Sequence, residues 1–349
     1  MTVRIVLITG ALLLGLIGPA SAASFDCSKA TTPFEVAICG NDELSLADER
    51  LSRTYQTAIG GLSEAALDTL RTDQREWLSY AQSACTVDAE PLSAGSYDEK
   101  GVACLIEVFG QRSHVLEASR MIDGRRYYPI SEQAALPDPY EAENPDSWWR
   151  VARHELALLQ LDEAAPYAED FNAFVRSQAD RLSDLAGAMD GSEPDALDNA
   201  SDTTASVTLH EQAGDKRISL EVNTYWYGHG AAHGTGGTNY LHYLVDEGRG
   251  LEASDLFTGK RWQSALLRLV ADALRSEHGD NLFLDNDEDI ADTVTDPARW
   301  DLSDDYYFIV QFNPYEVASY AYGYPTARVS WDDLAPYLSE NADTIRYGF

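Results

Sequence analysis

One stretch decides the fold of the C-terminal part of the chain: ISLEVNTYW, residues 218–226. Its apolar side chains, Ile218, Leu220 and Val222, alternate with polar ones. A period of two is typical of a strand that buries one face. The stretch therefore predicts a strand that packs against a core on one side.

Further elements are predicted on both sides of this strand. Val207 and Leu209 indicate a strand before it. The remaining expectations are a strand at 151–161, a helix over 171–185, an acidic loop at 188–203, strands at 240–245 and 306–312, a helix over 262–274, and a terminal helix opened by Ser330. Strands joined partly by hairpins and interrupted by single helices indicate an α+β domain with a mostly antiparallel sheet over residues 148–349.

The N-terminal part, residues 24–121, shows helical spacing instead. Thr32, Pro33 and Glu35 form a start signal, because Thr can cap a helix, Pro fits its first turn and Glu closes a capping box. Apolar residues then recur at spacings of three, four or seven along 44–62, 67–81 and 102–116. The pattern predicts an all-α helical bundle.

Four cysteines lie within this bundle: Cys27, Cys39, Cys85 and Cys104. An even number in one domain of an exported protein indicates two disulfides. Three pairings are possible, and the two local ones, Cys27 with Cys39 and Cys85 with Cys104, are favoured because each ties a short connection to the helix beside it. A tetracysteine metal site is the competing interpretation, but the spacing contains no CxxC.

A stretch rich in proline follows the bundle. Residues 122–147 contain Pro129, Pro137, Pro139 and Pro145 among Glu, Asp and Gly, without an apolar period. Such composition is typical of loops. We therefore expect residues 122–147 to be a linker between two domains.

The first residues have the order of a secretory signal. Arg4 precedes a short apolar run, and Ala20-Ser21-Ala22-Ala23 offers a small-residue cleavage site. Cys27 is not preceded by a Leu-led lipobox, and the apolar run is short for a membrane span. We expect residues 1–23 to be a signal peptide and the protein to be periplasmic or secreted, without a membrane anchor.

The chain is strongly acidic. Acidic residues outnumber basic ones 58 to 25, which gives a net charge of −33 at pH 7. This charge disfavours nucleic acid and anionic membranes as partners and attracts cationic molecules. Solubility, or adaptation to a salty habitat, is the alternative explanation of the same charge.

The helical part carries motifs of a known family. They are FDCSKA at 25–30, Glu35 followed by Ile38-Cys39, the segment 44–55 with Asp48, Leu51 and Tyr55, QRxWL at 74–78, and Cys85 with Cys104-Leu105. In these motifs residues 24–121 resemble the LprI lysozyme-inhibitor domain. The resemblance implies a helical fold and suggests lysozyme as a partner.

The C-terminal part carries motifs of a second family. They are YxYGxGAAHG at 225–234, the segment 251–257 and FNPYEVASYAxG at 312–323. Residues 150–338 thereby resemble the C-terminal domain of the anti-sigma factor RsiV, whose extracellular part binds lysozyme, and a companion domain found beside peptidoglycan deacetylase modules. Ser319 stands where family members often have Pro.

Two histidines lie four residues apart in the Gly-rich segment 228–237. On a helix, His229 and His233 would suit a metal, but five glycines disfavour a helix and no Glu stands beside the first His, as a zinc hydrolase needs. A hairpin loop in which glycine allows positive φ and His233 hydrogen-bonds the backbone is the simpler interpretation. A binding loop is the other.

Tyrosines concentrate in the stretch 313–325, and Trp226 and Tyr227 lie near them if the strands at 218–226 and 306–312 pair. Exposed Tyr offers rigid, amphipathic contact area, although half of these rings are expected in the core. The predicted partner-binding residues are Tyr225, Tyr227, His229, His233, Asn313, Tyr315, Glu316, Tyr320 and Tyr322.

Evidence for catalysis is thin. Asp285, Asp287 and Asp289 are spaced like calcium ligands of an EF-hand, but Ile290 replaces the required Gly and Asp296 the Glu, so a solvated acidic turn is expected. No nucleophile signature or phosphate-binding glycine motif is present. We predict no catalytic residue, no metal and no cofactor, and we expect the protein not to be an enzyme.

These observations lead to one prediction and one alternative. The prediction is an exported protein that binds and inhibits lysozyme-type muramidases, which are mostly strongly cationic. The alternative is an accessory module that binds peptidoglycan or another glycan without inhibiting an enzyme.

Overall fold

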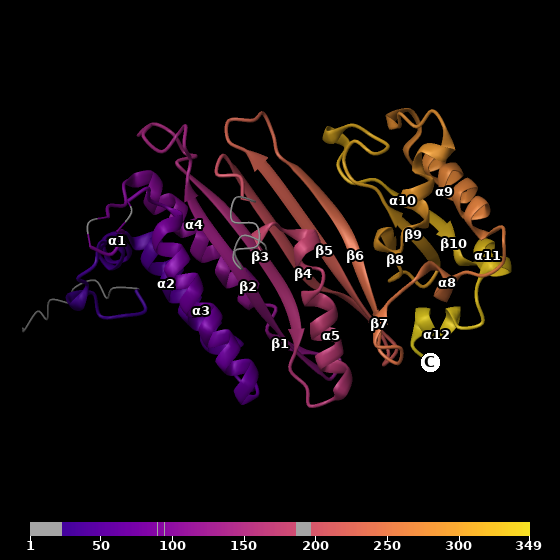
Figure 1. Ribbon diagram of the computed structural model, residues 1–349, viewed down its shortest axis with the longest axis horizontal. Coiled ribbons are helices and arrows are strands. Elements are labelled where there is room, and N and C mark those ends of the chain that lie inside the picture. The colour runs from indigo at the N-terminus through magenta and orange to yellow at the C-terminus, as the bar shows by residue number, and fades with distance from the viewer. Residues whose placement is uncertain (1–22, 89, 94, 186–196) are drawn as a thin grey trace, which may run out of the picture.

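The computed structural model describes residues 23–88, 90–93, 95–185 and 197–349 (Figure 1). The expected signal peptide, residues 1–23, lies outside them except for Ala23, which packs against the core of the helical part. Within the described residues, no helix combines the length and the apolar character that a membrane span requires.

The N-terminal part is helical, as predicted. The Thr32 hydroxyl accepts the Glu35 N–H and the Glu35 carboxylate accepts the Thr32 N–H, so the expected capping box opens the first helix. Disulfides join Cys27 to Cys39 and Cys85 to Cys104. The α-helices are α1 (Pro33–Gly40), α2 (Asp42–Ala58), α3 (Glu64–Ala84) and α4 (Glu99–Leu116), preceded by the 3-10 turn η1 (Cys27–Lys29).

A seven-stranded sheet follows, in the order β1-β2-β3-β4-β5-β6-β7. The strands are β1 (Arg120–Ile122), β2 (Arg125–Pro137), β3 (Val151–Leu161), β4 (Ser201–Ala213), β5 (Arg217–Gly228), β6 (Thr235–Leu244) and β7 (Arg249–Gly250). β3 pairs with β4 in parallel, and the other neighbouring pairs are antiparallel. The sheet is therefore mixed, although mostly antiparallel as expected.

The parallel pair explains the helices between β3 and β4. A parallel connection must cross over the sheet, usually through a helix. Here the crossover contains α5 (Pro166–Arg176) and α6 (Ala179–Leu182), so the single helix expected over 171–185 is divided. Phe171 and Val175 of α5 belong to the same core as Ile218 and Leu220 of β5, which confirms the buried face of that strand.

The acidic loop expected at 188–203 ends earlier than predicted. Residues 186–196 lie outside the described part, and residues 201–203 already belong to β4.

The prediction that residues 122–147 form a linker is wrong for the first half of that stretch. β2 occupies Arg125–Pro137 and pairs with β3 along its whole length. β1 pairs with β2 only as far as Tyr127. Beyond Tyr127, β2 has no neighbouring strand on the side opposite β3, so Pro129 is tolerated there although it has no N–H to donate. Only the second half, within the loop 138–150, is irregular.

The helical part lies directly beside β2 (Figure 1). Asp73 on α3 accepts the Ser131 N–H of β2 at 2.9 Å and forms a buried ion pair with Arg112 on α4. The Arg112 guanidinium also donates to the Ser131 hydroxyl at 2.7 Å. These contacts supply the hydrogen-bond partner that an edge strand lacks, and they fix the helices to the sheet.

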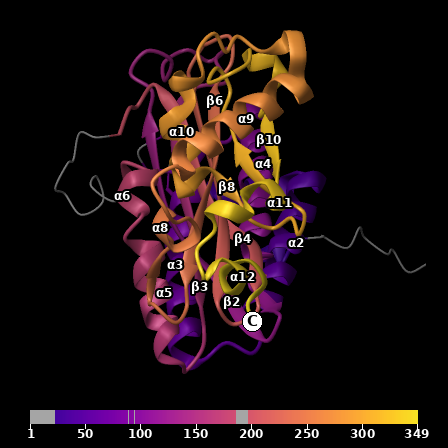
Figure 2. The same cartoon turned by 90° about the vertical axis from the view of Figure 1, so that its right-hand side faces the viewer.

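A C-terminal unit packs beside β6 (Figure 1) and faces the viewer in Figure 2. Its core contains Trp300, Phe308 and Phe312, and the Ser330 hydroxyl caps α11 by accepting the Asp332 N–H. A three-stranded antiparallel sheet has the order β10-β9-β8, with β8 (Trp300–Asp301), β9 (Tyr307–Gln311) and β10 (Thr326–Ser330). The helices are α8 (Ala253–Leu256), α9 (Trp262–His278), α10 (Ala291–Thr295), α11 (Trp331–Leu334) and α12 (Ala342–Tyr347), with 3-10 turns η2 (Gly279–Asn281), η3 (Asp287–Ile290), η4 (Pro297–Arg299), η5 (Tyr320–Tyr322) and η6 (Ala335–Tyr337).

His210 joins the two sheets. Its Nε2–H donates to Asp301 of β8 at 2.8 Å, and its Nδ1 lies 3.5 Å from a Glu221 carboxylate oxygen of β5. Hydrogen bonds to Asp301 and Glu221 raise the pKa of His210 to about 9, against the cost of burial. The charged imidazole is therefore the stabilising form.

We expect stability to fall as the pH rises through this pKa. A histidine with a raised pKa contributes its full stabilisation below the unfolded value, near 6.5, and loses it as the pH approaches 9. Since one pKa unit corresponds to about 1.4 kcal/mol, the loss should be on the order of 2 to 3 kcal/mol. Urea unfolding of the wild type and of His210→Gln measures this loss. The difference between their free energies of unfolding should shrink from pH 6 to pH 9.5. If the two free energies instead changed in parallel with pH, His210 would carry no such stabilising charge.

Candidate functional site

The Gly-rich segment 234–237, at the start of β6, lets side chains lie directly on its backbone. A Cβ at Gly234 would stand 2.4 Å from the Tyr225 ring, and one at Gly236 would stand 2.6 Å from the Tyr324 hydroxyl. A Cβ at Gly237 would stand 3.2 Å from the side-chain amide of Asn313. The glycines of this motif are therefore needed for close approach rather than for flexibility alone.

His233 and two tyrosines form a stack between the β5–β6 loop and the loop after β9. The His233 ring lies 4.1 Å from the ring of Tyr320 and 6.4 Å from that of Tyr315. His233 Nδ1–H donates to the Gly234 carbonyl at 2.8 Å, as its simpler interpretation expected. The two loops meet through this stack, although β5 and β9 lie in different sheets and do not pair.

The loop after β9 is shaped by its own polar groups. The Asn313 N–H donates to Glu316 Oε2 at 2.7 Å, and the Asn313 Oδ1 accepts the Thr238 N–H of β6 at 2.8 Å. Glu316 also forms an ion pair with Arg299. Tyr315 has a φ of 71°, a conformation that a bulky residue seldom adopts, and its side chain is exposed. Asn313 and Glu316 thus position the loop, while Tyr315 faces solvent.

Two other predicted tyrosines have local partners. The Tyr227 hydroxyl donates to the Ala231 carbonyl at 3.0 Å, which braces the β5–β6 loop. The Tyr322 hydroxyl lies 2.9 Å from His278 Nδ1, so Tyr322 is directed toward α9 rather than toward His233.

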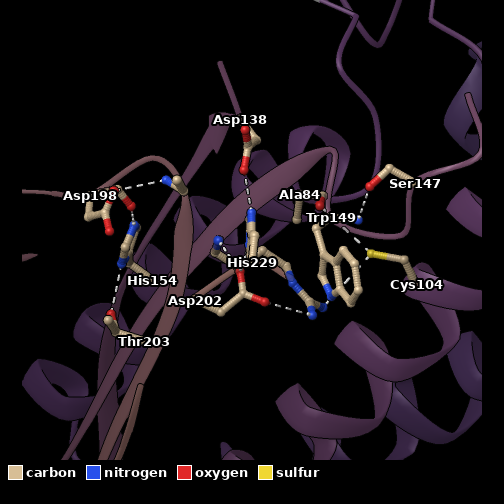
Figure 3. A network of polar contacts seen from close by, with 12 residues as sticks. Ala84, Cys104, Asp138, Ser147, Trp149, His154, Asp198, Asp202, Thr203 and His229 are labelled. Atoms are coloured by element: carbon tan, nitrogen blue, oxygen red, sulfur yellow. Dashed lines mark hydrogen bonds and ion pairs between the residues drawn. The ribbon is translucent and has the colours of Figure 1, made fainter. Parts of the chain in front are cut away.

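His229 is placed differently from the other predicted residues. Its imidazole is 3% exposed, with Nδ1 2.5 Å from Asp138 and Nε2 3.3 Å from Asp202 (Figure 3). Burial raises the pKa of Asp138, but hydrogen bonds from His229 and from the backbone N–H groups of Tyr140 and Glu141 outweigh it, and the pKa lies below its ordinary value. His229 therefore organises neighbouring loops and offers no contact surface of its own.

The same network reaches the helical part. Arg153 of β3 lies 3.7 Å from Asp202 and 3.7 Å from Glu107 on α4, and its guanidinium also approaches Cys104. The β5–β6 loop, the loop 138–150 and α4 are held together by these charges.

The loop 138–150 adds three aromatic residues that were not among the predicted partner-binding residues, and one of them, Tyr140, lies in the expected linker. Tyr140 is 82% exposed, Trp148 65% and Trp149 37%. The Trp149 ring lies 6.1 Å from that of Tyr227, so this loop continues the aromatic surface of the β5–β6 loop. Two adjacent tryptophans in a Pro-rich, acidic stretch could have indicated this surface from the sequence, because large aromatic side chains in a loop often make contacts.

The aromatic residues at this end of the molecule form one group, which we call the aromatic surface. The end of β5 and three loops at one end of the molecule, those after β2, β5 and β9, contribute to it (Figure 1). Its members are Tyr140, Trp148, Trp149, Tyr225, Tyr227, His233, Tyr315 and Tyr320. Carboxylates of Glu141, Glu143 and Asp146 stand in the first of these loops.

Metal chemistry finds no support in the described ranges. No group of three or more His, Cys, Asp or Glu side chains there could hold a metal ion. Asp287, one of the aspartates with calcium-like spacing, forms an ion pair with Arg275 and lies in η3 instead of a ligand loop.

Family comparisons match both ends of the chain. Residues 27–123 match the family described as lysozyme inhibitor LprI, and residues 254–332 match DUF3298, a family described as a protein of unknown function. The Gly-rich loop and the loop 138–150 lie outside both matches.

Relatives share the N-terminal part. An uncharacterized protein of Rhizobium meliloti (strain 1021) is 27% identical over 122 residues, which are 30% of this chain and 88% of that protein. Lipoprotein LprI of Mycobacterium tuberculosis (strain ATCC 25618 / H37Rv) is 33% identical over 73 residues, 21% of this chain and 35% of that protein. The chain thus spans about a third of the LprI lipoprotein.

Two crystal structures of DUF3298 family proteins are similar over 64% of this chain. The protein from Pseudomonas aeruginosa PAO1 is 16% identical, with a TM-score of 0.41 over 98% of its length. The protein from Bacteroides fragilis NCTC 9343 is 14% identical, with a TM-score of 0.44 over 97% of its length.

The two family matches agree with the motifs found in the sequence at both ends. This chain therefore carries an LprI lysozyme-inhibitor domain in its N-terminal part and a DUF3298 domain in its C-terminal part.

Proposed function

We propose that the protein is exported, binds lysozyme-type muramidases and inhibits them by covering their substrate cleft with the aromatic surface. The LprI match supports lysozyme as the partner. The observation that carries the proposal is the convergence of exposed aromatic rings from three loops on one end of an acidic molecule.

Charge and ring type both suit a cationic protein partner. The net charge of −33 favours its approach, and carboxylates of Glu141, Glu143 and Asp146 lie in the same loop as Trp148 and Trp149. Aromatic faces attract Arg and Lys side chains, and the Lys100 ammonium already lies 5.4 Å from the Trp148 ring centre. The aromatic surface therefore offers both attraction and apolar contact area.

Binding suits the residues of this region better than catalysis does. His229 is enclosed by Asp138 and Asp202, and His233 is stacked on Tyr320 and hydrogen-bonded to its own loop. Both imidazoles thus have structural partners. The two disulfides are typical of proteins that fold in an oxidising compartment, which supports export.

An inhibition assay tests the proposal. The purified protein, without the expected signal peptide, should slow the lysis of bacterial cell walls by at least one lysozyme from a panel of different types. Because opposite charges attract the partners, inhibition should weaken by roughly tenfold between low and physiological salt. Lysis at the uninhibited rate with every lysozyme at low salt would refute inhibition.

A further inference from the structure

A cavity of about 430 Å³ opens on the sheet face that carries the ends of β4, β5 and β6. The residues that concern its chemistry are Ser201, Thr203, Thr224, Trp226, Asn239 and Asn313. The register sets Thr203 directly opposite Trp226 and Ser201 opposite Gly228, and residues paired in this way project to the same face. The cavity volume lies within the range of small-ligand sites.

Ser201 gives the first indication of a ligand. It is fully buried, and its hydroxyl has no hydrogen-bond partner among the described residues. A buried hydroxyl without a partner is destabilising, so such groups are normally satisfied by something that the cavity holds. Ser201 can both donate and accept.

Thr203 gives the second indication. His154 Nε2 lies 3.0 Å from the Asp198 carbonyl, which can only accept, so this nitrogen carries the proton (Figure 3). Burial lowers the pKa of His154, so the ring is neutral and its Nδ1 accepts the Thr203 hydroxyl proton at 2.8 Å. The lone pairs of the Thr203 oxygen therefore remain as a fixed acceptor at the cavity wall.

Two amides complete the polar lining. Asn313 Oδ1 is engaged by the Thr238 N–H, which leaves its NH₂ group as the donor over Gly237. Asn239 provides a second amide on β6. These hydroxyl and amide groups match a ligand with many uncharged hydroxyls.

Trp226 supplies an apolar face at the same cavity. Its side chain is 43% exposed, and its ring lies against Gly228, where a Cβ would come within 2.7 Å of it. The flat face of an indole complements the C–H face of a sugar ring. Arg181, Asp184 and Asp198 also line the cavity, and the two carboxylates outnumber the one guanidinium, which disfavours an anion.

We propose that this cavity binds an uncharged saccharide. The cavity borders the aromatic surface that we assign to lysozyme, because Tyr225 lines both. Trp226 and Ser201 line the cavity and do not belong to that surface. Glycan binding, the alternative function that the sequence suggests, would then take place at this cavity, in addition to lysozyme binding.

Titration of the whole protein with soluble oligosaccharides tests the site. Chitotriose, cellotriose and maltotriose are the probes, followed by calorimetry and by the tryptophan fluorescence that Trp226 contributes. At least one probe should bind at millimolar concentration or below. Trp226→Ala should weaken binding at least tenfold, as the loss of a main contact does.

Ser201→Ala provides a second, smaller test, and should weaken binding by roughly twofold to tenfold, as the loss of one hydrogen bond does. Trp148→Ala, on the aromatic surface, is the matched control and should leave saccharide binding unchanged. Absence of binding by all probes, or equal binding by the wild type and Trp226→Ala, would overturn the proposal. Lysozyme inhibition is measured on the same variants, and should persist in Trp226→Ala, so the two proposals can fail separately.

Discussion

Replacement of Asp73 by alanine should lower the free energy of unfolding by about 3 to 5 kcal/mol, since removal of one partner leaves a buried charge uncompensated. The side chains of Asp73 and Arg112 are 5% and 1% exposed. Asp73 Oδ1 also accepts the Ser131 hydroxyl at 2.6 Å, and Arg112 Nε donates to Gln74 at 3.0 Å. The substitution therefore disturbs α3, α4 and β2 together.

Urea unfolding of Asp73→Ala measures this loss. Asp68→Ala is the matched control, because Asp68 lies on the same helix and its partner, Arg71, is largely exposed. Exposed pairs contribute at most about 1 kcal/mol, so the control should unfold almost like the wild type. Equal effects of the two substitutions would mean that the helical part is not fixed to the sheet by this pair.

The second large effect concerns the aromatic surface. We expect the double substitution Trp148→Ala, Tyr315→Ala to weaken lysozyme affinity by roughly 30-fold to 1000-fold, because aromatic residues at the centre of an interface often contribute about 1 to 2 kcal/mol each. Both side chains are more than half exposed, at 65% and 54%, so the fold should survive. Trp148 and Tyr315 come from different loops, so the double substitution tests whether both loops contact the same lysozyme molecule.

Tyr306→Ala is the control for that experiment. Tyr306 is 77% exposed but precedes β9, whereas Tyr315 follows it. Its removal should leave affinity unchanged. An unchanged affinity in the double variant would place the lysozyme contact elsewhere on the molecule.

Strong periodicity made most of the fold predictable. Ile218, Leu220 and Val222 are buried, and Thr32 and Glu35 form the expected capping box, because burial and local hydrogen bonds act on neighbours in sequence. β2 escaped prediction for the opposite reason. Most residues of its second half are partly buried against α3 and β3, so no clean alternation arises, and Pro129 suggested a loop.

The site was predictable only in its motifs. The sequence indicated that the Gly/His segment and the Tyr-rich segment both matter, and the structure brings His233 against Tyr320. The burial of His229 depends on Asp138 and Asp202, and Asp138 lies 91 residues away in sequence. Contacts over such separations follow from strand order, which no local pattern encodes. Trp148 and Trp149 directly follow residues 122–147, whose proline-rich composition predicts a linker and not a site.

The most direct test of lysozyme recognition is a calorimetric titration of the protein, from residue 24 onward, with each lysozyme of the panel at low salt. Our account predicts saturable binding to at least one of them, with an affinity that falls as salt is added. No detectable binding to any lysozyme under these conditions would contradict it.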